Sequence, residues 1–110
     1  AGGWSSWVTG TNVEDAMLIP LTPQVSGQAG ESVSISADGS IIVMGEVLYD
    51  GAATTSQGRV SVFFRPETGW VNAYADTELF SDSPVTNDRL GTGCHISADG
   101  TTIVAGGTET

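Results

Sequence analysis

One dipeptide of the sequence, Cys94-His95, places a nucleophile directly beside a base. A thiol activated by an imidazole is the basis of nucleophilic catalysis by cysteine. In a β-strand, however, adjacent side chains point to opposite faces of the sheet. We therefore predict that Cys94 lies on the core side as a small buried hydrophobe and that His95 lies on the other side. Because no nucleophile, base and acid converge elsewhere, we expect no catalytic residues and no enzyme activity.

Carboxylates form the second group that could do chemistry. Asp38 and Asp99 each precede a glycine, a position where Asp is favoured for local backbone bonding, so we interpret both as turn residues. A looser acidic group could bind calcium weakly, because Ca²⁺ takes oxygen ligands from loops. No ligand spacing supports such a site, so a solvated acidic face is favoured and no cofactor is expected. The residues of this group are Asp76, Glu78, Asp82 and Asp88.

The three tryptophans, Trp4, Trp7 and Trp70, could offer flat faces to sugar rings, so a glycan partner stays open. Trp70 begins a predicted strand, where packing is the favoured role. Trp4 and Trp7 lie near the N-terminus, and apolar residues at an open end are typical of a partner surface.

Composition narrows the class of protein. Of 110 residues, 39% are hydrophobic, 15% are charged and 15 are glycine, as is typical of one small all-β domain with many turns. The net charge is −10, with three Arg and no Lys, so nucleic acid and anionic membranes are not expected partners. No apolar run approaches the roughly 20 residues of a membrane-spanning helix. The acidic, Lys-free composition predicts an extracellular or cell-surface location. The sequence begins with Ala1 and not with Met, which is typical of a processed or excised segment.

The sequence also repeats itself. "ISADGSIIVMGE" at 35–46 returns as "ISADGTTIVAGG" at 96–107. Val33 matches Cys94, which sets the period at 61 residues (94 − 33). In each copy, apolar and small polar residues alternate up to an Asp-Gly turn and an apolar strand follows, which predicts a β-hairpin. A fixed period of this length indicates stacked structural repeats.

The first copy continues into two more predicted strands, so one repeat makes a sheet of four antiparallel strands. The predicted strands are Val33–Ser36, Ile41–Val47, Arg59–Arg65 and Trp70–Leu79. Five side chains of this sheet are predicted to be buried, namely Val33, Ile35, Val43, Val60 and Val62. Such sheets stack radially as the blades of a β-propeller. We therefore predict a single module over 1–110 of about two repeats: an outer strand within 1–21, a full blade over 30–80 and the first hairpin of the next blade over 91–107.

These residues resemble a known family. "NDRLGTGCHISADGTTIVAGG" and "GQAGESVSISADGSIIVMGE", followed by "QGRVSVFFRPETGW", are similar to FG-GAP-type β-propeller repeats of the integrin alpha-like class. Asp88, Leu90 and Gly91 stand at the positions of the family's Asp, Phe and Gly. The resemblance implies a blade and an extracellular or cell-surface location, and it implies no activity. Integrin-type members carry a longer acidic calcium loop, and the short Ser-Ala-Asp-Gly turn here departs from it.

One complete repeat cannot bury both faces of its own sheet, and repeat architectures usually need three or more units for stability. We predict a noncatalytic structural or interaction module that self-assembles head-to-tail, as a ring or a filament, by completing blades between copies. The predicted interface consists of Trp4, Trp7, Val8, Ile103 and Val104. The alternative is a segment of a larger cell-surface propeller, an adhesin or receptor, that packs on further repeats and binds a protein or glycan.

Overall fold

The computed structural model describes residues 16–52 and 54–107, and every regular element in these ranges is a β-strand. Four strands form an antiparallel sheet in the order β2-β3-β4-β6. They are β2 (Ala29–Ile35), β3 (Ile41–Glu46), β4 (Arg59–Phe64) and β6 (Thr77–Leu79). The described residues contain no helix, so none long and apolar enough to cross a membrane.

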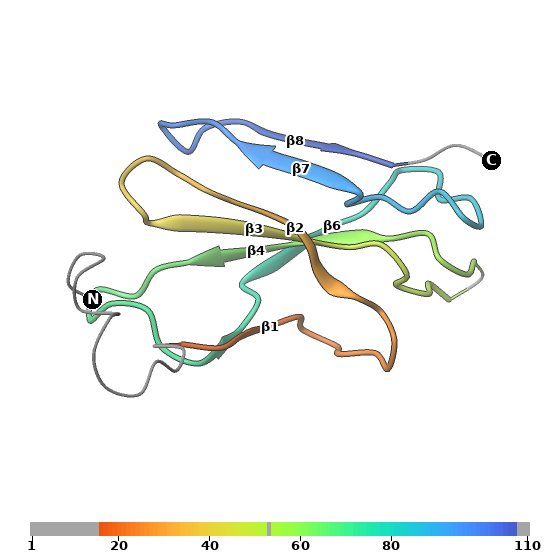
Figure 1. Cartoon of the computed structure of the whole chain (residues 1–110), viewed down its shortest axis with the longest axis horizontal. Coiled ribbons are helices and arrows are strands. Elements are labelled where there is room, and N and C mark those ends of the chain that lie inside the picture. The colour runs from red at the N-terminus through yellow and green to blue at the C-terminus, as the bar shows by residue number, and fades with distance from the viewer. Residues whose placement is uncertain (1–15, 53, 108–110) are drawn as a thin grey trace, which may run out of the picture.

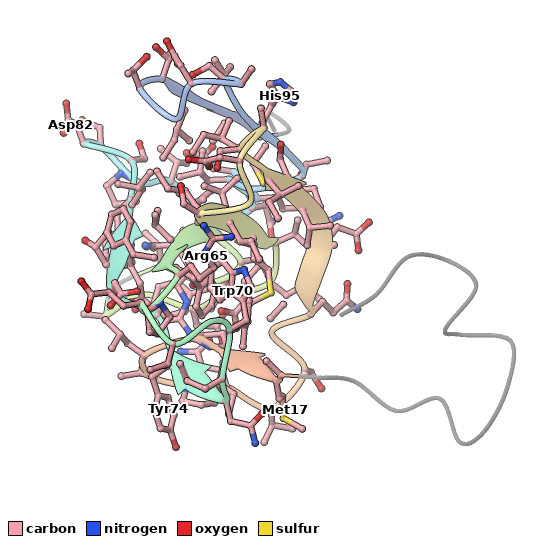
Figure 2. The ribbon with its side chains drawn as sticks, turned by 90° about the vertical axis from the view of Figure 1, so that its left-hand side faces the viewer. Met17, Arg65, Trp70, Tyr74, Asp82 and His95 are labelled. Carbon is pink, nitrogen blue, oxygen red and sulfur yellow. The ribbon has the colours of Figure 1, made fainter. Side chains whose placement is uncertain are left out.

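Two smaller pairs of strands lie on either side of this sheet (Figure 1). On one side, β1 (Leu18–Ile19) runs parallel to β5 (Ala73–Tyr74). On the other side, β7 (Gly93–Ile96) and β8 (Ile103–Gly106) form an antiparallel hairpin. The molecule is therefore a stack of three β layers with the four-stranded sheet in the middle. Figure 2 shows His95 at one end of the stack, Met17 and Tyr74 at the other, and Trp70 and Arg65 between them.

The core lies between the middle sheet and the β7–β8 hairpin. Val43, Val60 and Val62 point to this side of the sheet and form a buried cluster with Ile96 of β7. Val43 pairs with Val62 across β3 and β4, and directly opposite residues share one face of a sheet. The predicted burial of Val43, Val60 and Val62 is confirmed.

The predicted burial of Val33 and Ile35 is wrong. These side chains of β2 are 63% and 53% exposed. The predicted alternation along β2 is correct, but the small residues Ser32 and Ser34 face the β7–β8 layer. The apolar residues face the opposite side, where the β1–β5 layer covers β4 and leaves β2 open within the described residues.

The predicted fourth strand, Trp70–Leu79, is also wrong in its extent. Only Thr77–Leu79 joins the sheet, while Ala73–Tyr74 leaves it to pair with β1. Asp76 causes the break. Its amide donates to the carbonyl of Val62 at 2.9 Å, and its Oδ2 accepts the amide of Phe64 at 2.7 Å. A side chain thus takes the place that a neighbouring strand would occupy beside Phe64.

The first three predicted strands and the second hairpin are confirmed within a few residues. Of the outer strand predicted within 1–21, only Leu18–Ile19 is a strand among the described residues, and residues 1–15 lie outside the description. The coarse prediction of an all-β protein with antiparallel sheets is therefore confirmed.

Candidate functional site

The 61-residue repeat is present in the backbone as well as in the sequence. The described residues include four pairs, 61 positions apart, in which both members have a positive φ. A non-glycine residue at positive φ is uncommon, so such a coincidence marks one local structure built twice. The pairs are Ser26 and Asn87 (64° and 68°), Gln28 and Arg89 (62° and 54°), Gly30 and Gly91 (96° and 99°), and Gly39 and Gly100 (74° and 77°).

The register of the strands repeats with the same offset. Ser34 pairs with Val43 in the first hairpin, and His95 pairs with Val104 in the second. The β7–β8 hairpin is therefore the structural equivalent of β2–β3. Any residue of β2 or β3 can be compared with the residue 61 positions later.

The hairpin turns explain the two repeated aspartates. Oδ1 of Asp38 accepts hydrogen bonds from the Ser40 hydroxyl at 2.7 Å, the Ser40 amide at 3.0 Å and the Ser36 hydroxyl at 2.9 Å. These bonds, with those from Ser40 the strongest, lower the pKa of Asp38 from 3.8 to about 2. Asp99 accepts the equivalent bonds from Ser97 and Thr101, and they lower its pKa too, with the Ser97 hydroxyl first. The interpretation of both aspartates as turn residues agrees with this geometry.

The contact between the middle sheet and the β7–β8 hairpin is close and partly polar. The Ser32 hydroxyl donates to the carbonyl of Gly91 at 2.8 Å, and the Ala37 amide donates to the carbonyl of Ala98 at 2.9 Å. Ala37 and Ala98 are themselves 61 positions apart. The contact therefore joins a residue of one repeat to its own equivalent in the next.

Equivalent residues of the two repeats differ sharply in burial. Val43 is fully buried under the hairpin, whereas its equivalent Val104 is 64% exposed. Conversely, Ile96 is 2% exposed and its equivalent Ile35 is 53% exposed. One layer contact thus uses one face of each repeat. Within the described residues, the opposite face stays open at β2 in the first repeat and at the β7–β8 hairpin in the second. We take these two open faces as the candidate site.

The predicted interface residues fall in different places. Trp4, Trp7 and Val8 lie outside the described residues. Ile103 is half-buried and packs inward against the core cluster. Val104 points outward from the same strand. Within the described residues β8 pairs only with β7, so its second edge is open where the equivalent strand β3 pairs with β4.

Cys94 packs on the core side of β7 as predicted, but its side chain is half-buried and not fully buried. The Cys94 Sγ lies 3.2 Å from the Ser32 hydroxyl. His95 is exposed, and its Nδ1 lies 3.4 Å from the Ser34 hydroxyl. The side chains have separate partners.

The acidic group proposed for weak calcium binding is dispersed. Asp76 accepts the Phe64 amide, Glu78 contacts Arg59, and Asp88 accepts the Val85 amide at 3.0 Å. Among the described residues no three or more Asp, Glu, His or Cys side chains gather as a metal-binding group. Trp70 donates its indole N–H to the carbonyl of Gly39 at 3.0 Å, so its polar atom is bound to the hairpin turn.

A buried charge network on the other face of the sheet was not predicted. Arg59 is fully buried, with Nε 2.6 Å from Oε1 of Glu46 and Nη1 3.1 Å from Oε2 of Glu78. Its Nη2 also donates to the carbonyl of Thr22 at 2.7 Å, and the guanidinium lies 4.0 Å from the ring centre of Tyr49. The only sequence signal was an Arg at the start of an otherwise apolar strand.

A surface hollow of about 290 Å³ lies where the two repeats meet. Its lining includes two pairs of equivalent residues, Gln28 with Arg89 and Glu31 with Thr92, so both repeats contribute the same positions. The lining is completed by Val47 and Leu48.

Comparisons of the chain with protein-family models, with curated proteins and with solved structures found no match.

Proposed function

We propose that this protein is a noncatalytic structural module that self-assembles head-to-tail by completing propeller-like blades between copies. The four-stranded sheet is one complete blade in this proposal, and the β7–β8 hairpin is the first half of the next. The proposal treats the chain as similar to FG-GAP-type repeats and places it outside the cell or on its surface.

The observation that carries the proposal is the open edge of β8. In the first repeat, β3 pairs with β2 on one side and with β4 on the other. In the second repeat, β8 pairs with β7 alone among the described residues. An unpaired edge presents N–H and C=O groups that another chain can bind by adding a strand. By the period of 61, Ala1 corresponds to Val62 of β4, so the N-terminal segment of a second copy has the equivalent position for that strand.

The experiment compares the full 110-residue chain with a chain that lacks residues 1–9, by size-exclusion chromatography with light scattering and negative-stain imaging. We expect the full chain to form rings or filaments and the truncated chain to yield aggregation-prone monomers. A matched control keeps the length and replaces Trp4 and Trp7 with Ser, which separates the loss of backbone pairing from the loss of apolar side chains. A truncated chain that stays folded and assembled would refute blade completion by this segment.

The alternative is a segment of a larger surface propeller, an adhesin or receptor, whose open faces pack on further repeats of the same polypeptide. The hollow where the repeats meet favours this candidate, because clefts between repeated units are common places for ligands to bind. Here the 110-residue chain would stay monomeric at high concentration, and a protein or glycan would bind beside Gln28 and Arg89. Substituting Arg89 with Ala would then weaken that binding.

A further inference from the structure

Two glycines allow the layers inside one chain to approach closely. A Cβ atom on Gly45 of β3 would lie 2.1 Å from the carbonyl oxygen of Gly91, and a Cβ on Gly91 would lie 2.9 Å from the Cα of Gly45. No side chain fits at either position without moving backbone. Gly91 also has a φ of 99°, which L side chains rarely adopt. The contact between the layers therefore depends on this glycine pair.

The equivalents of these glycines are also glycines, and both are open. Gly106 is the equivalent of Gly45, and Gly30 is the equivalent of Gly91. A Cβ on either would meet no atom within 4 Å in the described part of the molecule. Nothing inside the described chain therefore requires a glycine at position 106, which has no positive φ.

We propose that the two open faces bind each other between two copies of this chain, with Gly106 of one copy against Gly30 of the next. The contact would repeat the one between the middle sheet and the β7–β8 hairpin. It rests on the proposed self-assembly and names the surface through which copies stack. The edge of β8 and the outer face of β8 are separate parts of that surface, so they can be tested separately.

The internal contact specifies the atoms that would meet. The cluster of Ile96 with Val43 becomes a contact of Ile35 with Val104 of the other copy. The bond from the Ala37 amide to the Ala98 carbonyl becomes one from the Ala98 amide to the Ala37 carbonyl of the next copy. Burial of Ile35 and Val104 would remove two exposed apolar side chains from water, which favours association.

Charge also favours a second copy as the partner. The chain has 13 acidic residues, yet the strand residues that would meet, 32–36 on one face and 93–97 with 101–107 on the other, contain no Asp, Glu, Lys or Arg. The acidic residues nearest to the contact, Glu31, Asp38 and Asp99, lie at its ends. Uncharged faces allow two copies of net charge −10 to approach there with the least local repulsion. The remaining repulsion is screened by salt, so the association should strengthen from low to physiological ionic strength.

The decisive variant is Gly106→Ala, measured by sedimentation velocity beside the native chain. We expect its thermal midpoint and circular dichroism to match the native chain, because the methyl group meets nothing inside the described molecule. We expect its association to weaken by more than tenfold, because the methyl group would collide with the Gly30 carbonyl of the next copy. The control is Gly93→Ala. Its equivalent in the first repeat is Ser32, so the internal contact already accepts a side chain at this position.

A substitution that should raise the affinity between two copies tests the same model. Ser32 donates to the carbonyl of Gly91 in the internal contact, and Gly93 lacks that hydroxyl. Gly93→Ser would restore the bond across the interface, to the Gly30 carbonyl of the next copy. We expect association to tighten roughly two- to tenfold, the range of one net hydrogen bond.

Cross-linking tests whether Ile35 of one copy lies close to Val104 of another, and this test does not depend on the stability of the Gly106→Ala variant. Two proteins, Ile35→Cys and Val104→Cys, each also carrying Cys94→Ser, are mixed and treated with a short bismaleimide. We expect a heterodimer from this mixture and none when Val25→Cys replaces Val104→Cys, because Val25 is an exposed turn residue outside the strands that would meet.

The outcomes separate the two proposals. A native chain that stays monomeric at all concentrations overturns self-assembly, and this inference with it. Assembly that is unchanged by Gly106→Ala and gives no Ile35–Val104 cross-link overturns the stacking face while leaving blade completion at the β8 edge. Loss of assembly in Gly106→Ala together with the cross-link in the native background supports the inference.

Discussion

Replacing Arg59 with Met tests whether the buried charge network stabilises the middle sheet. Met keeps most of the length of the side chain and removes the charge. Glu46, whose side chain is almost fully buried, then loses its counter-charge at 2.6 Å. The change also breaks the bond to the Thr22 carbonyl and the contact with the Tyr49 ring.

The expected loss is about 3–5 kcal/mol of unfolding free energy, the range for breaking a buried ion pair by removing one partner. A domain of this size has roughly 5–15 kcal/mol in total, so the variant should lose a large fraction of its stability. Urea denaturation followed by circular dichroism measures the loss. Adding Glu46→Gln should recover part of it, because the second substitution removes the uncompensated charge.

Arg65→Met is the matched control. Arg65 is exposed and donates one hydrogen bond, to the Asp38 carbonyl at 3.2 Å, so its loss should cost about 0.5 kcal/mol or less. If Arg59→Met costs as little unfolding free energy as Arg65→Met, the guanidinium does not stabilise the middle sheet and the reasoning fails.

Two further predictions concern a turn and the core. The folded-state pKa of Asp38 is lowered to about 2, so its contribution to stability is complete above 3.8 and is lost as the pH falls toward 2. An NMR titration should place the Asp38 midpoint near 2 and show it rising in Ser40→Ala, and a midpoint near 3.8 in the native protein would contradict the hydrogen-bond model. Phe63 is buried and Phe64 is half exposed on the opposite face, so Phe63→Ala should cost about 3–5 kcal/mol and Phe64→Ala far less. Equal losses in urea denaturation would show that the faces of β4 are assigned wrongly.

Local signals in the sequence predicted the hairpins well. The Asp-Gly turns at 38–39 and 99–100 fix both position and register, because Gly39 and Gly100 take the positive φ that such turns require. The repeat then predicted that β7–β8 copies β2–β3, and the register confirms it. Strand alternation also predicted that Cys94 faces the core, and Cys94 does pack against the core cluster while His95 is exposed.

Features that depend on neighbouring layers could not be predicted. Alternation places Val33 and Ile35 on one face of β2, but it does not say whether another layer covers that face. The strand predicted over Trp70–Leu79 was broken by hydrogen bonds of Asp76 to residues more than ten positions away. The buried role of Arg59 needs Glu46 and Glu78 to come from two other strands, and no spacing in the sequence encodes that meeting.

The parallel pairing of β1 with β5 has a consequence for the order of folding. Beside these strands, the Met17 amide donates to a side chain 55 positions later, on Asn72. The two hairpins close turns of only a few residues and can form within microseconds. Pairing β1 with β5 must close a long loop, whose entropy opposes it until the middle sheet exists. The β1–β5 layer is therefore the last to close, and the hydrogen bond from Arg59 to the Thr22 carbonyl, three residues after β1, forms only then.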